Sequence, residues 1–279
     1  MPNQTRTVST PDYTMGYGED YLEFLAGERA SEQAVETIAL LRPRLRPGLR
    51  LLDLGCGPGQ VTAVLAEAVA PGETWGIDME PSQVELARTV ASERGGAHAR
   101  FEVADAAELP FGDGSFDVVT CLDLLAYVPD TSRVLAEVRR VLKPGGTLFC
   151  REMVIDSSFA YPNTEIIDRG WQIFADLLES DDGHPQMGKE LGLRLLDGGF
   201  SDVSQRMTFE TYAEETDVER FYRLVTGWFL GSEIRQAAQQ YGVQDEHEAQ
   251  RLAEQMQVWR STPGALAALA FGEALATRP

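Results

Sequence analysis

Three aspartates and a glycine-rich turn are the features of this sequence that are best suited to bind a small charged molecule. Asp53 lies in the apolar run LLDL, and three alternating glycines follow it within Leu54–Gln60, LGCGPGQ. A glycine-rich turn between a strand and a helix lets a ligand lie against bare backbone. Asp78 ends the next strand-like run, TWGID, and Asp105 ends the third. The aspartates therefore stand at or close to the places where strands are expected to end.

Three kinds of ligand use such a turn: nucleoside triphosphates, dinucleotides and sulfonium nucleosides. A triphosphate-binding loop continues into Gly-Lys-Ser/Thr, whereas Gln60 and Val61 follow the last glycine here. A dinucleotide fingerprint, GxGxxG, needs a glycine at position 60, and Asp53 would repel the pyrophosphate. A ligand with an ammonium group and a positive sulfur is instead attracted by that carboxylate. Asp78 is placed to accept both ribose hydroxyls, a role that is common to NAD and sulfonium nucleosides.

The segments around these residues alternate between strand-like and helix-like patterns. Strands are expected at 50–54, 74–78, 99–105, 116–122 and 147–154, and helices at 60–69, 80–96 and 131–146. This alternation is typical of a parallel sheet with helices on both faces. Ligands of such sheets bind at the carboxyl ends of the strands, so the turn and the aspartates are expected to converge. The predicted fold class is α/β, with a doubly wound, seven-stranded Rossmann-like sheet and helical lid insertions.

The rest of the chain is expected to form a cap, two lid insertions and two returns to the core. The predicted units are an N-terminal helical cap segment at 1–47, a cofactor-binding Rossmann-like core at 48–154, a lid insertion at 155–187, a core helix and strand at 188–213, a helical lid insertion at 214–262 and the final strand of the core at 263–279. Both insertions are rich in aromatic residues, among them Trp171, Phe221 and Trp259. Aromatic residues at helical spacing usually pack as core. Over a ligand site they also suit a bulky apolar or aromatic substrate.

Composition narrows the classes of partner and the compartment. The formal net charge is -20, from 24 basic and 44 acidic residues, and a nucleic-acid partner would need a basic track that the sequence lacks. The three cysteines lie far apart without a ligand at metal spacing, which favours buried free thiols over a zinc site or a disulfide framework. No stretch is long and apolar enough to span a membrane. We therefore expect a cytoplasmic protein with a small-molecule substrate, and the sequence leaves a homodimer open.

Five motifs in order make this sequence similar to a known family. LLDLGCGPG, GIDMEPSQVELAR, VADAAELPFGDGSFDVVTC, LAYVPD and RVLKPGG resemble the successive motifs of class I S-adenosylmethionine-dependent methyltransferases. The resemblance is strongest to the ubiquinone- and menaquinone-biosynthesis type and its relatives that tailor natural products. It covers residues 48–154, and it implies S-adenosylmethionine as the cofactor and S-adenosylhomocysteine as its product.

The resemblance also implies roles for individual residues. The turn at 55–59 would contact the methionine part of the cofactor, Asp78 would hold the ribose, and Asp105 with Ala106 would hold the adenine. Cys121 would offer its backbone carbonyl to the methionine amine, with Leu122 beside it. Together the implied cofactor-binding residues are Tyr17, Asp53, Gly55, Cys56, Gly57, Gly59, Gln60, Asp78, Met79, Gln83, Asp105, Ala106, Cys121 and Leu122.

Few side chains are placed to take a proton from a methyl acceptor. Methyl transfer is an in-line displacement in which the protein mainly aligns the reactants and excludes water, and some acceptors also need a base. The candidates are His184 at the end of the first insertion, Glu152 just past the fifth strand, and Tyr127 in LAYV, where relatives often have histidine. No complete set of metal-ligating acids is evident, so we expect no metal.

Two other functions remain open from the sequence. A protein can bind S-adenosylmethionine without transferring its methyl group, either as a cyclisation catalyst or as a structural partner, because folds are borrowed for other functions. A nicotinamide-dependent oxidoreductase is the third alternative. The N-terminal segment with Tyr17 is expected to close over the cofactor site.

Overall fold

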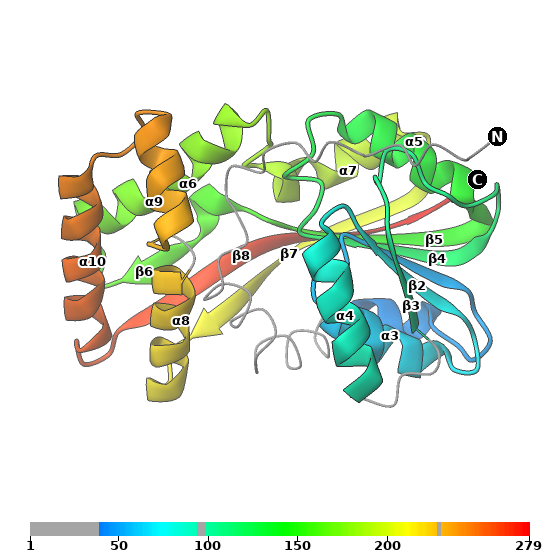
Figure 1. Ribbon diagram of the computed structural model, residues 1–279, viewed down its shortest axis with the longest axis horizontal. Helices are drawn as coiled ribbons and strands as arrows, with labels where there is room; N and C mark the ends of the chain where they lie inside the picture. The colour runs from blue at the N-terminus through cyan, green and yellow to red at the C-terminus, as the bar shows by residue number, and fades with distance from the viewer. Residues whose placement is uncertain (1–38, 94–98, 228–229) are drawn as a thin grey trace, which may run out of the picture.

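A computed structural model describes residues 39–93, 99–227 and 230–279 (Figure 1). Tyr17 and the predicted cap segment before residue 39 lie outside the described residues. Within them, the chain folds around one mixed sheet of eight strands, which confirms the predicted fold class. The first described helical element is the short 3-10 helix η1, Arg42–Arg44.

The sheet has the strand order β3-β2-β1-β4-β5-β8-β6, with β7 paired to the other edge of β8. Its strands are β1 (Leu51–Leu54), β2 (Thr74–Asp78), β3 (Ala99–Val103), β4 (Phe116–Leu122), β5 (Leu142–Met153), β6 (Phe159–Tyr161), β7 (Ser201–Tyr212) and β8 (Leu266–Thr277). Strands β1 to β5 run parallel, whereas β8 is antiparallel to β5, β6 and β7. The order reverses between β1 and β4, and such a reversal opens a crevice at the carboxyl ends of the strands.

Helices cover both faces of the parallel half. Helices α3 (Gln60–Val69) and α4 (Pro81–Glu93) lie below the sheet in Figure 1, and α5 (Thr131–Val141) and α7 (Met187–Asp197) lie above it. Successive strand residues serve opposite faces: Leu51 packs with the α3 side chains, and Leu52 packs with those of α5. Because both faces are covered, all four residues of β1 are buried, and Asp53 is the one polar residue among them.

A second group of helices lies at the far end of β8 (Figure 1). It comprises α6 (Glu165–Ser180), α8 (Glu215–Gly227), α9 (Ser232–Gln240) and α10 (Glu246–Arg260). The Phe221 ring lies 5.3 Å from the ring of Trp259 and 6.4 Å from that of Trp171, centroid to centroid. These aromatic side chains form part of the core of this helical group, and an apolar cavity of about 20 Å³ lies beside Trp171 and Phe221.

Two details differ from the sequence-based expectations. The sheet has eight strands rather than seven, because the short segment Phe159–Tyr161 pairs with the start of β8. The helix expected at 131–146 ends at Val141, and β5 already begins at Leu142. Pro144 cannot extend a helix, and Gly145 has a φ of 76°, so this segment enters the strand through an irregular register instead. The boundaries of the six predicted units stay predictions.

Candidate functional site

The glycine turn connects β1 to α3, and its glycines are needed for different reasons. Gly55, Gly57 and Gly59 have φ values of 65°, 49° and 75°, which residues with a side chain rarely adopt. A Cβ on Gly59 would also lie 2.7 Å from the Cβ of Ala87, so this glycine lets α4 pack closely. Among the described residues, a Cβ on Gly57 would meet only the Gln83 Oε1, at 3.9 Å. Gly57 therefore leaves its backbone open to a ligand.

Asp53 lies beneath the turn and is 2% exposed. Its carboxylate accepts hydrogen bonds from the hydroxyls of Thr62 on α3, at 2.6 Å, and Thr120 on β4, at 2.7 Å. Burial raises the pKa of Asp53 to about 6. The carboxylate thus joins three elements below the site, and any attraction to a cationic ligand acts through the turn rather than by an exposed oxygen.

Asp78 ends β2 with its carboxylate against the glycine turn. Its Oδ2 accepts the backbone N–H of Gly57, and its Oδ1 accepts that of Glu80, both at 3.0 Å. Burial raises the pKa of this carboxyl above its ordinary value. The next residue, Met79, is 37% exposed, so it does not fill the core. Each carboxylate oxygen has a second lone pair that can accept from a ligand hydroxyl.

Gln83, on the first turn of α4, is a buried polar residue whose side chain has no hydrogen-bond partner among the described residues. It is 0% exposed, and neither its Oε1 nor its Nε2 has a hydrogen-bond partner within the described residues. Buried amides are normally paired, so an orphaned one next to a bare turn indicates a ligand that supplies the partner. Gln60 begins α3 on the other side of the turn and is also buried.

The cysteines near the site point their thiols into the protein. Cys56 donates its backbone N–H to Ile77 at 2.9 Å, and burial raises the pKa of its thiol. Cys121 is 1% exposed and is the register partner of Cys150, whose thiol raises the pKa of Cys121 well above the ordinary value. Leu122 then ends the strand, half-buried. Cys121 and Leu122 can therefore offer only backbone groups to a ligand.

Asp105 lies in the loop between β3 and β4, beside the end of β2. The backbone N–H of Ala104 donates to the Asp78 carbonyl at 3.0 Å, which ties the start of this loop to the end of β2. Asp105 itself is exposed, and its Oδ1 accepts the N–H of Ala107 at 2.7 Å. Ala106, which lies between Asp105 and Ala107, is half-buried and packs on the core. The turn, Asp78 and Asp105 are therefore brought together along one edge of the sheet.

Glu152 is fully buried and holds the loop after β4. Its Oε1 accepts the backbone N–H groups of Leu124 at 3.1 Å and Leu125 at 2.7 Å, and its Oε2 accepts that of Ala126 at 3.2 Å. Burial, together with the nearby charge of Asp123, raises the pKa of Glu152 to about 8. The three backbone hydrogen bonds to Glu152 were not foreseen from the sequence, because side-chain types do not reveal contacts made by backbone groups.

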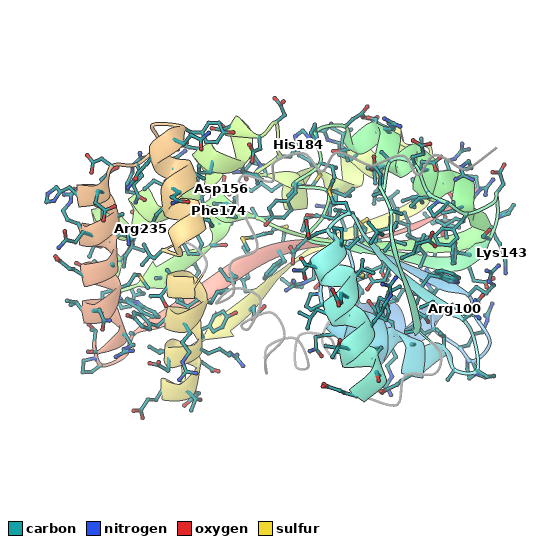
Figure 2. The ribbon with its side chains drawn as sticks, viewed as in Figure 1. Arg100, Lys143, Asp156, Phe174, His184 and Arg235 are labelled. Carbon is teal, nitrogen blue, oxygen red and sulfur yellow. The ribbon has the colours of Figure 1, made fainter. Side chains whose placement is uncertain are left out.

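His184 and Tyr127 converge on the same loop. The backbone N–H of His184 donates to the Ala126 carbonyl at 2.7 Å, and that of Tyr127 donates to the Leu124 carbonyl at 2.9 Å. Figure 2 shows His184 at the junction of α6 and α7, above the sheet. Its buried Nε2 has no hydrogen-bond partner within the described part of the chain. The three candidate catalytic residues thus meet around residues 124–127.

The described residues contain no group of side chains that is suited to bind a metal ion. No three His, Cys, Asp or Glu side chains there are grouped so that they could hold a metal ion. None of the described helices is long and apolar enough to cross a membrane.

The fold and the site together define a doubly wound α/β domain with a glycine turn at the carboxyl ends of its strands. Residues 45–183 match the family described as the methyltransferase domain. The methyltransferase GfsG of Streptomyces halstedii is 33% identical over 183 residues, which are 65% of this chain and 63% of that protein. The demethylmenaquinone methyltransferase of Anoxybacillus flavithermus is 40% identical over 112 residues, 40% of this chain and 47% of its own length.

A solved structure shares the fold. The [4+2]-cyclase SpnF has a TM-score of 0.56 and 23% identity, over 89% of this chain and 81% of its own. Residues 45–183 are a methyltransferase domain of the S-adenosylmethionine-dependent class, as the motifs predicted. The matched stretch covers less than two thirds of either curated relative, 63% of one and 47% of the other.

Proposed function

We propose that this protein binds S-adenosylmethionine across the Gly55–Gly59 turn and transfers its methyl group to a small, bulky apolar or aromatic acceptor. The observation that carries the proposal is the pairing of an open backbone at Gly57 with the orphaned buried amide of Gln83. Asp78 completes this arrangement with a buried carboxylate that touches the same turn. These residues fit an aminoacyl nucleoside, which offers hydroxyl and amine donors to a carboxylate and an amide.

Each part of the cofactor has residues suited to hold it. Asp78 accepts the ribose hydroxyls through the free lone pairs of its carboxylate, and Met79 lies next to the nucleoside. Asp105 accepts the exocyclic amine of adenine, and the Ala106 backbone reads the edge of the ring. The carbonyl of Cys121 accepts from the methionine amine, beside Leu122, and the buried charge of Asp53 stabilises that amine from below. Cys56, Gln60 and Gln83 line the rest of the proposed cofactor site.

The chemistry requires little of the protein beyond alignment. When bound, the sulfonium supplies an electrophilic methyl group that an acceptor can take by in-line displacement. The protein aligns the acceptor and excludes water from it. Of the candidate bases, His184 is the best supported, because its buried Nε2 lacks a partner within the described residues. Glu152 already accepts three backbone hydrogen bonds, and Tyr127 is fixed to the same loop by its backbone.

The proposed acceptor class rests on one relative. The aromatic rings of Phe221 and Trp259 are buried against each other, in the helices at the end of the sheet away from α3 and α4 (Figure 1), so they do not by themselves define the acceptor. Demethylmenaquinone methyltransferase acts, by its name, on an apolar quinone. A quinone-like or natural-product acceptor of similar apolar character is therefore our proposal. The buried free thiols Cys56, Cys121 and Cys150 are consistent with a reducing, cytoplasmic setting, and a homodimer is one assembly to test.

The engagement of Glu152 by three backbone donors also favours a second candidate, a protein that binds the cofactor without methylating. Incubation with methyl-labelled S-adenosylmethionine and a panel of hydroquinones and hydroxylated macrolides separates the two. Labelled product with release of S-adenosylhomocysteine supports the transferase. Tight cofactor binding with no label transferred to any acceptor in the panel supports the non-methylating protein instead.

A further inference from the structure

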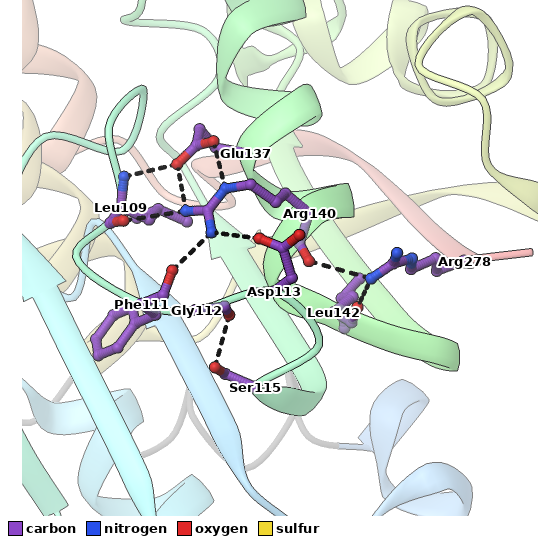
Figure 3. A network of polar contacts seen from close by, with 9 residues as sticks. All are labelled: Leu109, Phe111, Gly112, Asp113, Ser115, Glu137, Arg140, Leu142 and Arg278. Atoms are coloured by element: carbon purple, nitrogen blue, oxygen red, sulfur yellow. Dashed lines mark hydrogen bonds and ion pairs between the residues drawn. The ribbon is translucent and has the colours of Figure 1, made fainter.

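The loop between β3 and β4 carries the adenine-reading residues of the proposed site, and helix α5 holds several points of it. Arg140, on α5, donates to the carbonyls of Leu109 at 3.0 Å and Phe111 at 2.6 Å, and to the Asp113 carboxylate at 3.0 Å. Its own backbone carbonyl accepts the N–H of Gly114 at 3.0 Å. Figure 3 shows this guanidinium at the centre of the network. One side chain therefore fixes several points of the loop.

Glu137, one turn earlier on the same helix, completes the arrangement. Its carboxylate receives two hydrogen bonds from Arg140, both at 2.7 Å, and accepts the backbone N–H of Leu109 at 2.8 Å. The Arg140 guanidinium holds the pKa of Glu137 below its ordinary value. The two side chains together satisfy both backbone polar groups of Leu109, and we name them the Arg140–Glu137 clamp.

The clamp lies only a few residues from Asp105. The loop starts at Ala104, whose N–H is tied to the Asp78 carbonyl, and it becomes fixed again at Leu109, which is 5% exposed. Between these points, Asp105 accepts hydrogen bonds from the nearby Ala107 and Glu108 N–H groups, and Ala106 packs half-buried on the core. The position of the Asp105 carboxylate therefore depends on where Leu109 is held.

We propose that Arg140 and Glu137 are positioning residues that set the selectivity of the site for adenine, through the loop that they hold. The inference rests on the proposed function, because it assumes that Asp105 accepts the adenine amine. The pair is suited to the role because a planar guanidinium can serve two carbonyls and a carboxylate at fixed angles, which a lysine cannot do.

The test compares two ligands by calorimetry: S-adenosylhomocysteine and S-inosylhomocysteine, in which a carbonyl replaces the amine of the base. The unaltered protein should prefer the adenine form, because Asp105 accepts from the amine and repels the carbonyl. Arg140→Met should weaken binding of the adenine form about tenfold, comparable to the loss of one or two hydrogen bonds. It should change binding of the inosine form by much less, so the selectivity shrinks. Arg140→Lys should retain only part of the selectivity of the unaltered protein for the adenine form.

Arg133→Met is the matched control, because Arg133 lies on the same helix and its ion pair, with the exposed Glu108, is a long one of 3.9 Å. It should leave both affinities within about twofold. Glu137→Gln preserves the side-chain shape, so it tests the clamp if Arg140→Met fails to fold. An equal loss for both ligands, or no loss at all, would overturn the inference. Absence of S-adenosylhomocysteine binding by the unaltered protein would instead refute the proposed function.

Discussion

Two loops flank the glycine turn, and they are held in opposite ways. The loop between β3 and β4 is fastened from outside by the Arg140–Glu137 ion pair, whose side chains are 30% and 20% exposed. The loop after β4 is fastened from within by Glu152, which is fully buried and faces three backbone N–H groups. Water can replace contacts of the first kind at small cost, but not those of the second. The first loop is therefore suited to tune selectivity, and the second is part of the core.

Removal of the buried carboxylate should have the largest effect. Glu152→Gln places an amide N–H against the backbone N–H groups that the carboxylate now accepts, so buried donors lose their partner. We expect the free energy of unfolding to fall by about 2–4 kcal/mol, measured by urea denaturation. Asp156→Asn is the control, because that half-exposed carboxylate pairs with Lys189 at 2.5 Å and should cost less than about 1 kcal/mol. Equal losses would remove the distinction between the loops.

A side chain on the turn should abolish binding without a comparable loss of stability. Gly57→Val fills the space in front of the backbone, where only the Gln83 amide lies nearby. We expect S-adenosylhomocysteine affinity to fall at least a hundredfold, and the positive φ to cost about 1–2 kcal/mol of stability. Gly242→Val matches the backbone strain, since Gly242 has a φ of 68° and open space around it, far from the turn in sequence. Calorimetry that shows equal binding by the two variants would contradict the assignment of the turn.

The two carboxylates also predict a pH dependence of opposite sign. The folded pKa of Glu152 is raised to about 8 from an ordinary value of 4.5, so the folded state binds more protons between these values. The contribution of Glu152 to the free energy of unfolding should therefore fall as the pH rises from about 5 to 8. Glu137 has a lowered pKa, so its contribution is present above its ordinary pKa and lost in acid.

Denaturation at a series of pH values, compared with Glu152→Gln, isolates the first contribution. The difference between the two proteins should shrink as the pH rises from 6.5 to 8, a range above the pKa of about 6 of Asp53, another buried acid. A difference that is constant over this range would mean that Glu152 does not titrate there.

The smallest effect should come from the exposed edge of the clamp. Asp113 contacts Arg140 at 3.0 Å, but its side chain is 80% exposed. Asp113→Asn should therefore change thermal stability by no more than the equivalent of about 0.5 kcal/mol and leave cofactor affinity unaltered. A large loss in a thermal melt would show that the ion pair acts as a network, and the two loops would then differ less than we infer.

Residues that carry a chemical signal could be predicted from the sequence. The glycine turn, the strand-end aspartates and the alternation of elements each have a local cause, so the α/β class and the place of the site were predictable. Glu152 was predicted as a candidate base, but its three backbone partners depend on tertiary packing that no local pattern encodes. The same holds for Arg140, which reads as an ordinary surface arginine on α5. The strand β6 is only three residues long, and it owes its pairing to β8, more than a hundred residues later.

The central claim is that a sulfonium nucleoside, not a dinucleotide, is held across the turn by Asp78. Calorimetric titration of the unaltered protein, Asp78→Asn and Asp78→Ala with S-adenosylhomocysteine and with NAD tests it directly. We expect the unaltered protein to bind S-adenosylhomocysteine and not NAD. The affinity should fall most in Asp78→Ala and less in Asp78→Asn, because the amide retains one acceptor for the ribose. Binding of NAD in place of S-adenosylhomocysteine, or an unchanged affinity in Asp78→Ala, would contradict it.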